Sequence, residues 1–280
     1  MRAKFIVNDY VLIWNLLFQA SISETMYKLK QKIWQTYKSE YNLVFKDKTM
    51  MMKDYKNFIP NNDAIYNILL ENKDYLKLKK EVEKYRLEVM KLWDKNKKET
   101  TNLFNNILRL DIVDYTIFVV NPVLNIIEQP SKNTLIVGKE IDKKHSMNLL
   151  LDITREIANN NIKEYHGEAE KFKLAILEFA LDNEYATNLS KINYFEYNSK
   201  GLVNLKKWLY PYWLMYLGVP KDELKKRMER DNISFDDTKY AYEKELKKMN
   251  IQEFIDFCIR NKRYIVREHK MDKPVIIDVI

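Results

Sequence analysis

The chain has 280 residues, of which 46% are hydrophobic and 13% aromatic, and this composition predicts a folded protein rather than a disordered one. Only 4 glycines and 6 prolines are present, so few tight turns can form, which favours long helices over a many-stranded β protein. The single cysteine, Cys258, excludes an internal disulfide framework and favours a reducing compartment, which indicates a cytoplasmic protein.

The formal net charge of +8 does not by itself indicate nucleic-acid binding. Basic and acidic residues are interspersed, for example in "KLKKEVEKYRLEVMKLWDKNKKE", as is typical of a solvated helix face with ion pairs one turn apart. The apolar stretch near the N-terminus is interrupted by Asn8, Asp9 and Asn15 and is shorter than the ~20 residues that span a bilayer. We therefore expect neither a nucleic-acid nor a membrane partner, and the oligomeric state stays open.

Residues 1–110 are predicted to be mainly helical. One helix begins near Ser23, a suitable N-cap, and a charged helix covers about residues 74–98. The character changes at residue 112. The segments "IVDYTIFVVNP" and "NTLIVGKEI" are short and rich in β-branched and aromatic residues, which predicts two strands of a small sheet.

Gly138 ends the second predicted strand before the helix "LLLDITREIANNN". A further helix covers about residues 164–189, and residues 200–262 are again mostly helical. The predicted fold class is therefore α+β, predominantly α-helical with a small β-sheet. We expect a single compact domain of residues 1–280, made of a helical part (1–110), a core (112–190) and a second helical part (200–280).

The helix after the second predicted strand contains a degenerate form of a zinc-peptidase motif. In His-Glu-x-x-His the histidines lie four residues apart, so both imidazoles project from one helix face onto one metal ion, and the glutamate polarises the attacking water. The same frame reads "REIAN" over residues 155–159. The next predicted helix contains "NEYATN" over residues 183–188, and its glutamate, Glu184, follows 25 residues after Asn159.

With these segments and the strands before them, residues 112–190 resemble a zincin-like core, that of a gluzincin-type metallopeptidase. In that family the third zinc ligand is a glutamate on the next helix. The resemblance implies that Arg155, Asn159 and Glu184 stand at metal-ligand positions, and that Glu156 stands at the position of the general base.

The departures from the family pattern concern the ligands themselves. Arg155 stays protonated and offers no lone pair, and Glu184 alone would not hold zinc in the usual geometry. Asn188 replaces an aspartate that supports the first histidine in the family, and Asn183 precedes Glu184 as in the family motif. Glu156 has no metal-bound water to activate. We therefore expect no metal and no cofactor, and a catalytically inactive metallopeptidase homologue (a pseudoenzyme) that binds a peptide or protein in the former active-site cleft.

Two alternatives stay open. The first is an active metal-dependent hydrolase with an atypical site, and the second is a helical interaction protein unrelated to peptidases. An ordinary amphipathic helix also accounts for the motif, because Arg155 and Asn159 lie opposite the stripe of Leu149, Ile153 and Ile157 and would then face solvent.

Glu184 is harder to assign to a solvated surface, because its predicted helix is apolar over most of its circumference. A carboxylate there is expected to be partly buried and to need a partner. If residues 112–190 fold as in a gluzincin, the guanidinium of Arg155 can take the place of the metal. We then expect an Arg155–Glu184 salt bridge with nitrogen–oxygen distances of roughly 2.7–2.9 Å.

The remaining candidates fit ordinary structural roles better. His145, His166 and His269 have no second histidine at metal-ligand spacing. Cys258 lies at helical spacing with Phe254 and is expected to be a small core residue. The aromatic cluster in "WLYPYWLMY" is likewise expected to pack in the core.

Overall fold

The computed structural model describes residues 2–18, 70–112, 114–142, 146–190, 201–230, 233 and 237–266, together with the separate positions 24, 27, 28, 31 and 35. The chain divides into two compact units: unit 1 contains Met1–Lys97 and Ile112–Asn160, and unit 2 contains Lys98–Asp111 and Asn161–Ile280. Each unit is described by itself, and the single domain of residues 1–280 stays a prediction. The helix expected to begin near Ser23 lies largely outside the described residues.

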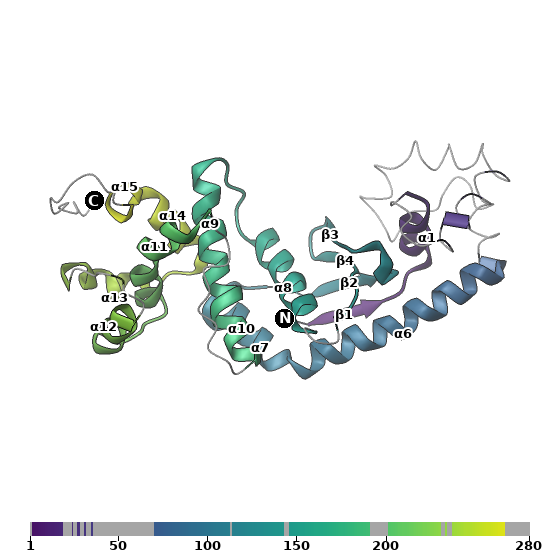
Figure 1. Cartoon of the computed structure of the whole chain (residues 1–280), viewed down its shortest axis with the longest axis horizontal. Coiled ribbons are helices and arrows are strands. Elements are labelled where there is room, and N and C mark those ends of the chain that lie inside the picture. The colour runs from purple at the N-terminus through teal and green to yellow at the C-terminus, as the bar shows by residue number, and fades with distance from the viewer. Residues whose placement is uncertain are drawn as a thin grey trace. The chain divides into compact units, whose positions relative to one another are not determined.

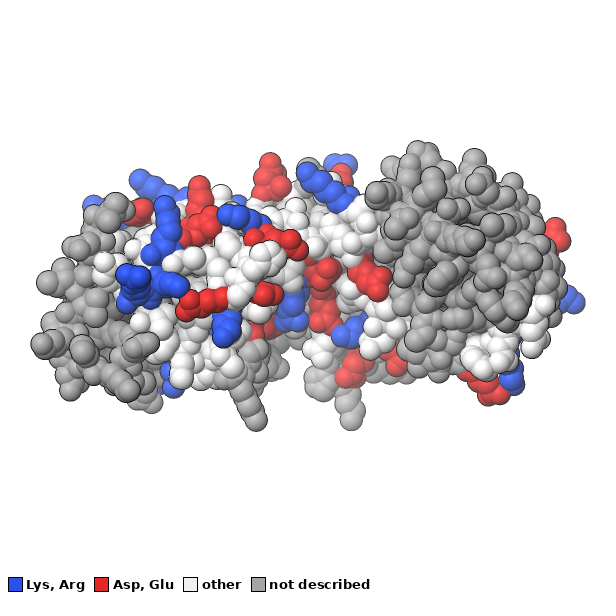
Figure 2. Space-filling view, turned by 90° about the horizontal axis from the view of Figure 1, so that it is seen from above, with Lys and Arg blue, Asp and Glu red and all other residues white. Residues whose placement is uncertain are grey.

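The described part of the chain is predominantly helical with one four-stranded sheet, which confirms the predicted α+β class (Figure 1). None of its helices is both long enough and apolar enough to cross a membrane. On the face drawn in Figure 2, basic and acidic side chains lie close to one another, in line with the interspersed charges of the sequence.

Unit 1 contains the sheet. Its strands are β1 (Ala3–Ile6), β2 (Tyr115–Val119), β3 (Ile126–Ser131) and β4 (Thr134–Gly138), in the spatial order β1-β2-β4-β3. β2 pairs in parallel with both β1 and β4, and Ile117 stands opposite Phe5 on one side and Leu135 on the other. β3 pairs antiparallel with β4. The two inner strands are almost fully buried, as expected for strands with a neighbour on each side.

The two strands predicted from the sequence are confirmed as β2 and β4, but the prediction missed the two edge strands. β1 lies in the part predicted to be helical; its 4 residues are too short to show a strand period. β3 lies between the two predicted strands, and it was missed because its sequence "IIEQPS" is half polar and contains Pro130. Proline is tolerated on an edge strand, and the pairing of β3 with β4 is irregular between Glu128 and Ser131.

The α-helices described in unit 1 include α1 (Asp9–Phe18), α6 (Lys73–Lys95) and α8 (Met147–Asn161), whose last residue belongs to unit 2, and η2 (Pro122–Leu124) is a short 3-10 helix after β2. α6 begins at Asn72, whose side chain accepts hydrogen bonds from the backbone N–H groups of Asp74 and Tyr75. Its buried residues are apolar or aromatic and recur every three or four positions, and the helix runs along β1 and β2 (Figure 1). The Trp93 ring meets Phe5 of β1 edge to face, with 5.8 Å between the ring centroids. α8 confirms the helix predicted for residues 149–161.

Gly138 ends β4 at a point where two backbones approach closely. A Cβ atom at this position would lie 2.6 Å from Cγ2 of Val120 and 2.7 Å from the carbonyl oxygen of Asn121. The second of these atoms belongs to the backbone and cannot rotate away. Only glycine therefore fits between β4 and the segment after β2, which fixes where the following residue, Lys139, leaves the sheet.

We expect Gly138→Ala to lower the free energy of unfolding by about 1–3 kcal/mol, because the added methyl group overpacks this contact. Urea unfolding followed by circular dichroism measures the loss. Gly201→Ala is the matched control, since a Cβ atom there meets nothing within 4 Å. Equal stabilities of the two variants would contradict the close approach.

Unit 2 is helical throughout its described residues. Its elements are α7 (Lys97–Asn102), which begins at the last residue of unit 1, η1 (Leu103–Ile107), α9 (Glu168–Glu178), η3 (Phe179–Tyr185), α10 (Ala186–Ser190), α11 (Val203–Tyr216), α12 (Lys221–Arg230), η4 (Asp237–Tyr242), α13 (Glu243–Leu246), α14 (Ile251–Arg260) and α15 (Lys262–Ile265). The single helix predicted for about residues 164–189 is in fact α9, η3 and α10. η3 is a π-helix of 7 residues, a geometry that the helical period of the sequence does not reveal.

Stacked aromatic rings form the centre of unit 2. Trp213 stacks on Phe179 of η3 and on Tyr216, with 5.7 and 5.2 Å between ring centroids, and Tyr216 stacks on Phe254 of α14 at 4.6 Å. All four side chains are buried, as are Tyr210 and Tyr212, so four aromatic residues of the predicted cluster belong to the core, while Trp208 is half-buried. Cys258 is also buried, as predicted, and burial raises the pKa of its thiol.

Arg109 joins the short segment 98–111 to the rest of unit 2. Its φ is 52°, which turns the chain shortly after η1. The guanidinium donates hydrogen bonds to the carbonyl oxygens of Lys247, Met249 and Tyr216 at 2.6, 2.8 and 2.8 Å. It also lies over the Tyr216 ring, 4.3 Å from the centroid, and the Tyr216 hydroxyl donates to the carbonyl of Ile107 at 2.6 Å.

Candidate functional site

α8 carries the motif that the sequence singles out. Its buried face consists of Leu149, Leu150, Ile153, Thr154, Ile157 and Ala158. The Thr154 hydroxyl forms a hydrogen bond within the helix, in which it donates to the carbonyl oxygen of Leu150 at 2.8 Å. Arg155, Glu156 and Asn159 lie outside the buried face and are half-buried.

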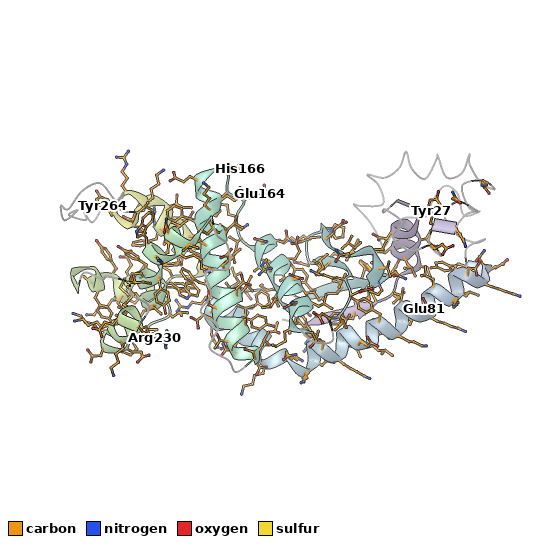
Figure 3. All side chains as sticks on the ribbon, in the orientation of Figure 1. Tyr27, Glu81, Glu164, His166, Arg230 and Tyr264 are labelled. Atoms are coloured by element: carbon orange, nitrogen blue, oxygen red, sulfur yellow. The ribbon has the colours of Figure 1, made fainter. Side chains whose placement is uncertain are left out.

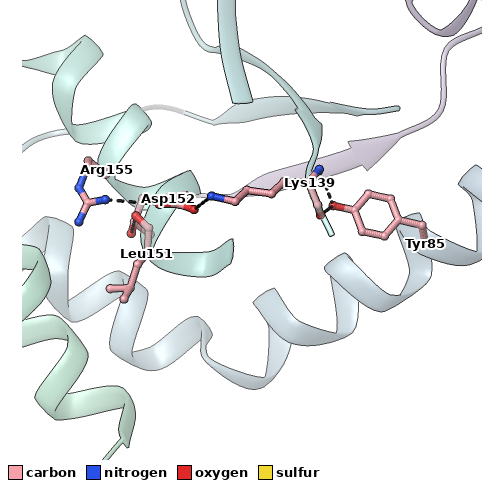
Figure 4. Close-up of polar contacts among 6 residues, drawn as sticks. Tyr85, Lys139, Leu151, Asp152 and Arg155 are labelled. Atoms are coloured by element: carbon pink, nitrogen blue, oxygen red, sulfur yellow. Dashed lines mark hydrogen bonds and ion pairs between the residues drawn. The ribbon is translucent and has the colours of Figure 1, made fainter. Parts of the chain in front are cut away.

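Arg155 pairs with an acid one turn earlier on the same helix. Its Nη1 lies 3.3 Å from Oδ1 of Asp152, and the other oxygen of that carboxylate lies 2.5 Å from Nζ of Lys139 (Figure 4). The Asp152 carboxylate therefore forms ion pairs with two cations at once. All three side chains are partly open to solvent, since Arg155, Asp152 and Lys139 keep 38%, 25% and 39% of their exposure. Each ion pair is expected to contribute about 0–1 kcal/mol.

Lys139 is also held through its backbone. The Tyr85 hydroxyl, from α6, donates to the carbonyl oxygen of Lys139, and the Lys139 N–H points back at the same hydroxyl at 3.3 Å (Figure 4). Burial raises the pKa of Tyr85 well above its ordinary value, so this hydroxyl keeps its proton. The chain of contacts Tyr85–Lys139–Asp152–Arg155 thus connects α6, the end of β4 and α8 within unit 1.

Glu156, the positional match to the general base, makes an ordinary contact of a helix surface. Its carboxylate accepts a hydrogen bond from the side-chain amide of Asn160, one turn later, at 3.1 Å. Nothing in this contact distinguishes Glu156 from other glutamates on exposed helix faces. Asn159 is half-buried on the same helix.

Glu184 belongs to η3 in unit 2 and is partly buried, as its apolar surroundings predict. The indole N–H of Trp213 donates to its carboxylate at 3.4 Å. Burial raises the pKa of Glu184, while the hydrogen bond from Trp213 and the charge of Arg227 lower it by less. Asn188, on α10, is half-buried.

Beside Glu184, η3 and α11 enclose a buried ammonium group. Lys206 has no exposed surface, and its Nζ lies 3.1 Å from Oε2 of Glu178 and 3.5 Å from Oδ1 of Asn183. The ammonium also lies over the Phe179 ring, 5.2 Å from its centroid. The sequence gives little sign of this pair, because Lys206 stands in "NLKKWL", where a lysine is ordinarily solvated. Lys206 stands three residues before Leu209 on α11, a helical spacing that places it near the apolar face and indicates burial.

The expected Arg155–Glu184 salt bridge stays a prediction. Arg155 lies in unit 1 and Glu184 in unit 2, and each is described within its own unit. Each has a contact within its own unit, Arg155 with Asp152 and Glu184 with Trp213. Asp152 was not singled out from the sequence, although acidic and basic residues three apart on a helix commonly pair.

The side chains at the motif positions do not fit a zinc ion. Arg155 cannot be a ligand, and no group of three histidine, cysteine, aspartate or glutamate side chains among the described residues could hold a metal. His166 is exposed in the loop before α9, next to Glu164 (Figure 3). His145 and His269 lie outside the described residues. No catalytic step through a metal follows from this arrangement.

Comparison with known proteins gives no relative. No protein-family model, no curated protein and no solved structure matches the chain.

The raised pKa of Glu184 makes a directional prediction about stability. Because ionisation of this carboxyl is unfavourable in the folded state, its contribution to stability is fully present below the ordinary pKa of a glutamate and is lost as the pH rises through the higher folded-state pKa. We expect the stability of the wild type, relative to Glu184→Gln, to fall as the pH rises from acid to neutral. Urea unfolding of both proteins across this range measures it.

Glu223→Gln provides the control of opposite sign. The pKa of Glu223 is lowered by its hydrogen bond from Arg227, so the wild type should gain stability relative to this variant as the pH rises. A pH-independent difference between the wild type and Glu184→Gln would show that the Glu184 carboxyl is as well solvated in the folded state as in the unfolded chain.

Proposed function

We propose that the chain is a catalytically inactive, zincin-like metallopeptidase homologue that acts by binding a peptide or protein. The order of elements supports this proposal. β2, β3 and β4 precede α8, which carries Glu156, and the next helical segment carries Asn183 and Glu184. This is the order in which the resembling family presents its strands, its zinc-binding helix and its third ligand.

One observation supports the proposal that the site is catalytically inactive. At the first ligand position, Arg155 presents a guanidinium that is already paired with Asp152 and retains 38% of its exposure. A guanidinium is a fixed cation with several N–H donors and no lone pair, so it binds carboxylates and carbonyl oxygens rather than metal ions. The same helix face that would hold zinc in a peptidase is therefore suited to contact a peptide through charge and hydrogen bonds.

Rebuilding the metal ligands tests the zincin-like arrangement. We expect Arg155→His with Asn159→His to create a weak zinc site, because two imidazoles one helical turn apart can share one ion. Isothermal titration with zinc measures the affinity. Adding Glu184→Gln should weaken binding about tenfold or more, because the proposal makes Glu184 the third ligand.

The matched control places the same two histidines on an exposed face of α6, as Lys77→His with Glu81→His. This pair binds zinc only as an isolated helical pair, so Glu184→Gln should leave its affinity unchanged. If Glu184→Gln also leaves the affinity of the rebuilt α8 site unchanged, the zincin-like arrangement is wrong and the motif belongs to an ordinary amphipathic helix.

The loss of activity has its own test. We expect the purified protein to carry no stoichiometric zinc by elemental analysis and to leave casein uncleaved above background, because Arg155 removes a ligand and Glu156 has no metal-bound water to polarise. Glu156→Gln should change neither result. Metal-dependent cleavage that disappears in Glu156→Gln would instead establish an active hydrolase.

A further inference from the structure

Unit 2 contains a concavity that the proposed function does not use. It has a volume of about 900 Å³, opens to solvent, and is lined by Lys163, Lys244, Glu245, Lys248, Met249, Glu253, Asp256, Ile259 and Arg260. These residues come from the loop before α9, from α13 and the turn after it, and from α14. All of them belong to unit 2.

The four cations of this concavity have no carboxylate partner among the described residues, whereas several other cations of unit 2 have one. Examples of such pairs are Lys206–Glu178, Arg227–Glu223, Lys247–Glu243 and Lys262–Glu168. Within the concavity, Lys163 lies only over the Tyr165 ring, with its Nζ 5.6 Å from the centroid. Lys244, on α13, and Lys248, in the turn after it, both line the concavity.

Two of the three carboxylates in the lining are already used inside the protein. Asp256 accepts hydrogen bonds from the Tyr165 hydroxyl at 2.7 Å and from the Gln252 amide at 3.2 Å. Arg260 follows Asp256 by one turn of α14, a spacing at which an ion pair commonly forms, but the contacts of Asp256 are with Tyr165 and Gln252. Glu253 accepts the backbone N–H of Asn250 at 2.8 Å as part of the N-terminal capping box of α14.

We propose that this concavity binds an acidic peptide segment of a partner protein. Four cations without a carboxylate partner among the described residues stand against three carboxylates, so the lining carries a net positive charge and favours a ligand that brings its own negative charges. Met249 and Ile259 add apolar contacts for the side chains between those charges.

The lining argues against two other kinds of ligand. The carboxylates within it would repel the closely spaced phosphates of a nucleic acid. A small molecule is ordinarily bound in a pocket that covers most of its surface, whereas this concavity is open. An extended peptide can occupy an open concavity along its length and place its acidic residues beside the lysines while its other side chains avoid the wall carboxylates.

The experiment uses the full chain and a fluorescein-labelled peptide of alternating glutamate and leucine, with binding followed by fluorescence anisotropy at low ionic strength. We expect saturable binding that added salt weakens. Lys244→Glu with Lys248→Glu should weaken it about tenfold or more, since each substitution turns an attraction into a repulsion. Arg260→Gln should give a smaller loss in the same direction, and circular dichroism checks that each variant is folded.

The matched control changes the net charge equally at residues of unit 1, which do not line the concavity. Lys77→Glu with Lys84→Glu alters two exposed lysines of α6 in unit 1 and should leave the affinity within about twofold. A peptide with lysine in place of glutamate should not bind. Equal losses in the two charge-reversal variants, or tighter binding of a single-stranded oligonucleotide or of ATP than of the acidic peptide, would overturn the proposal.

Discussion

The attachment made by Arg109 is the constraint on which the rest of unit 2 depends. Helices leave carbonyl acceptors unsatisfied at their C-terminal ends, and the guanidinium fills this role for α11 and for the turn after α13 at the same time. A single residue in a left-handed backbone conformation thereby holds two helix ends and the aromatic ring between them. Because α11 carries both Lys206 and Trp213, the buried ion pair and the aromatic stack are positioned by this attachment.

The Asp152 ion pairs of unit 1 and the Lys206–Glu178 ion pair of unit 2 differ in their exposure to solvent. In unit 1 the carboxylate of Asp152 lies between two cations that remain partly solvated, so its pairs mainly orient the side chains of α8. In unit 2 the ammonium of Lys206 has left water entirely and depends on Glu178 and Asn183 for solvation. A buried pair of this kind adds little stability over apolar residues, but loss of one partner is costly. The contacts of Lys206 join α11 to Glu178 of α9 and Asn183 of η3, so the cost of losing a partner falls on the packing of these helices.

The sequence predicts those features that follow from a repeated local pattern. Runs of β-branched and aromatic residues identified β2 and β4, and the helical period identified α8. β1 and β3 were missed because one is too short and the other too polar to show a strand pattern. The burial of Lys206 depends on contacts across 28 residues, which no local pattern encodes. For the candidate site, the sequence located Glu156 and Glu184 on helices and predicted the partial burial of Glu184, but it did not identify Asp152 or Trp213 as the neighbours.

The π-helical turn of η3 affects which face of the helix each later residue occupies. A π-helix fits more residues into each turn than an α-helix, so Phe179–Tyr185 holds the equivalent of an inserted residue. Deleting one residue there would let the segment return to α-helical geometry with the residues from Ala186 onward on the faces that they now occupy. Keeping every residue but winding the segment as an α-helix would instead rotate those residues by roughly 100° about the helix axis. An alignment or a graft that carries α9 through α10 as an uninterrupted α-helix would therefore assign the residues of α10 to the wrong face.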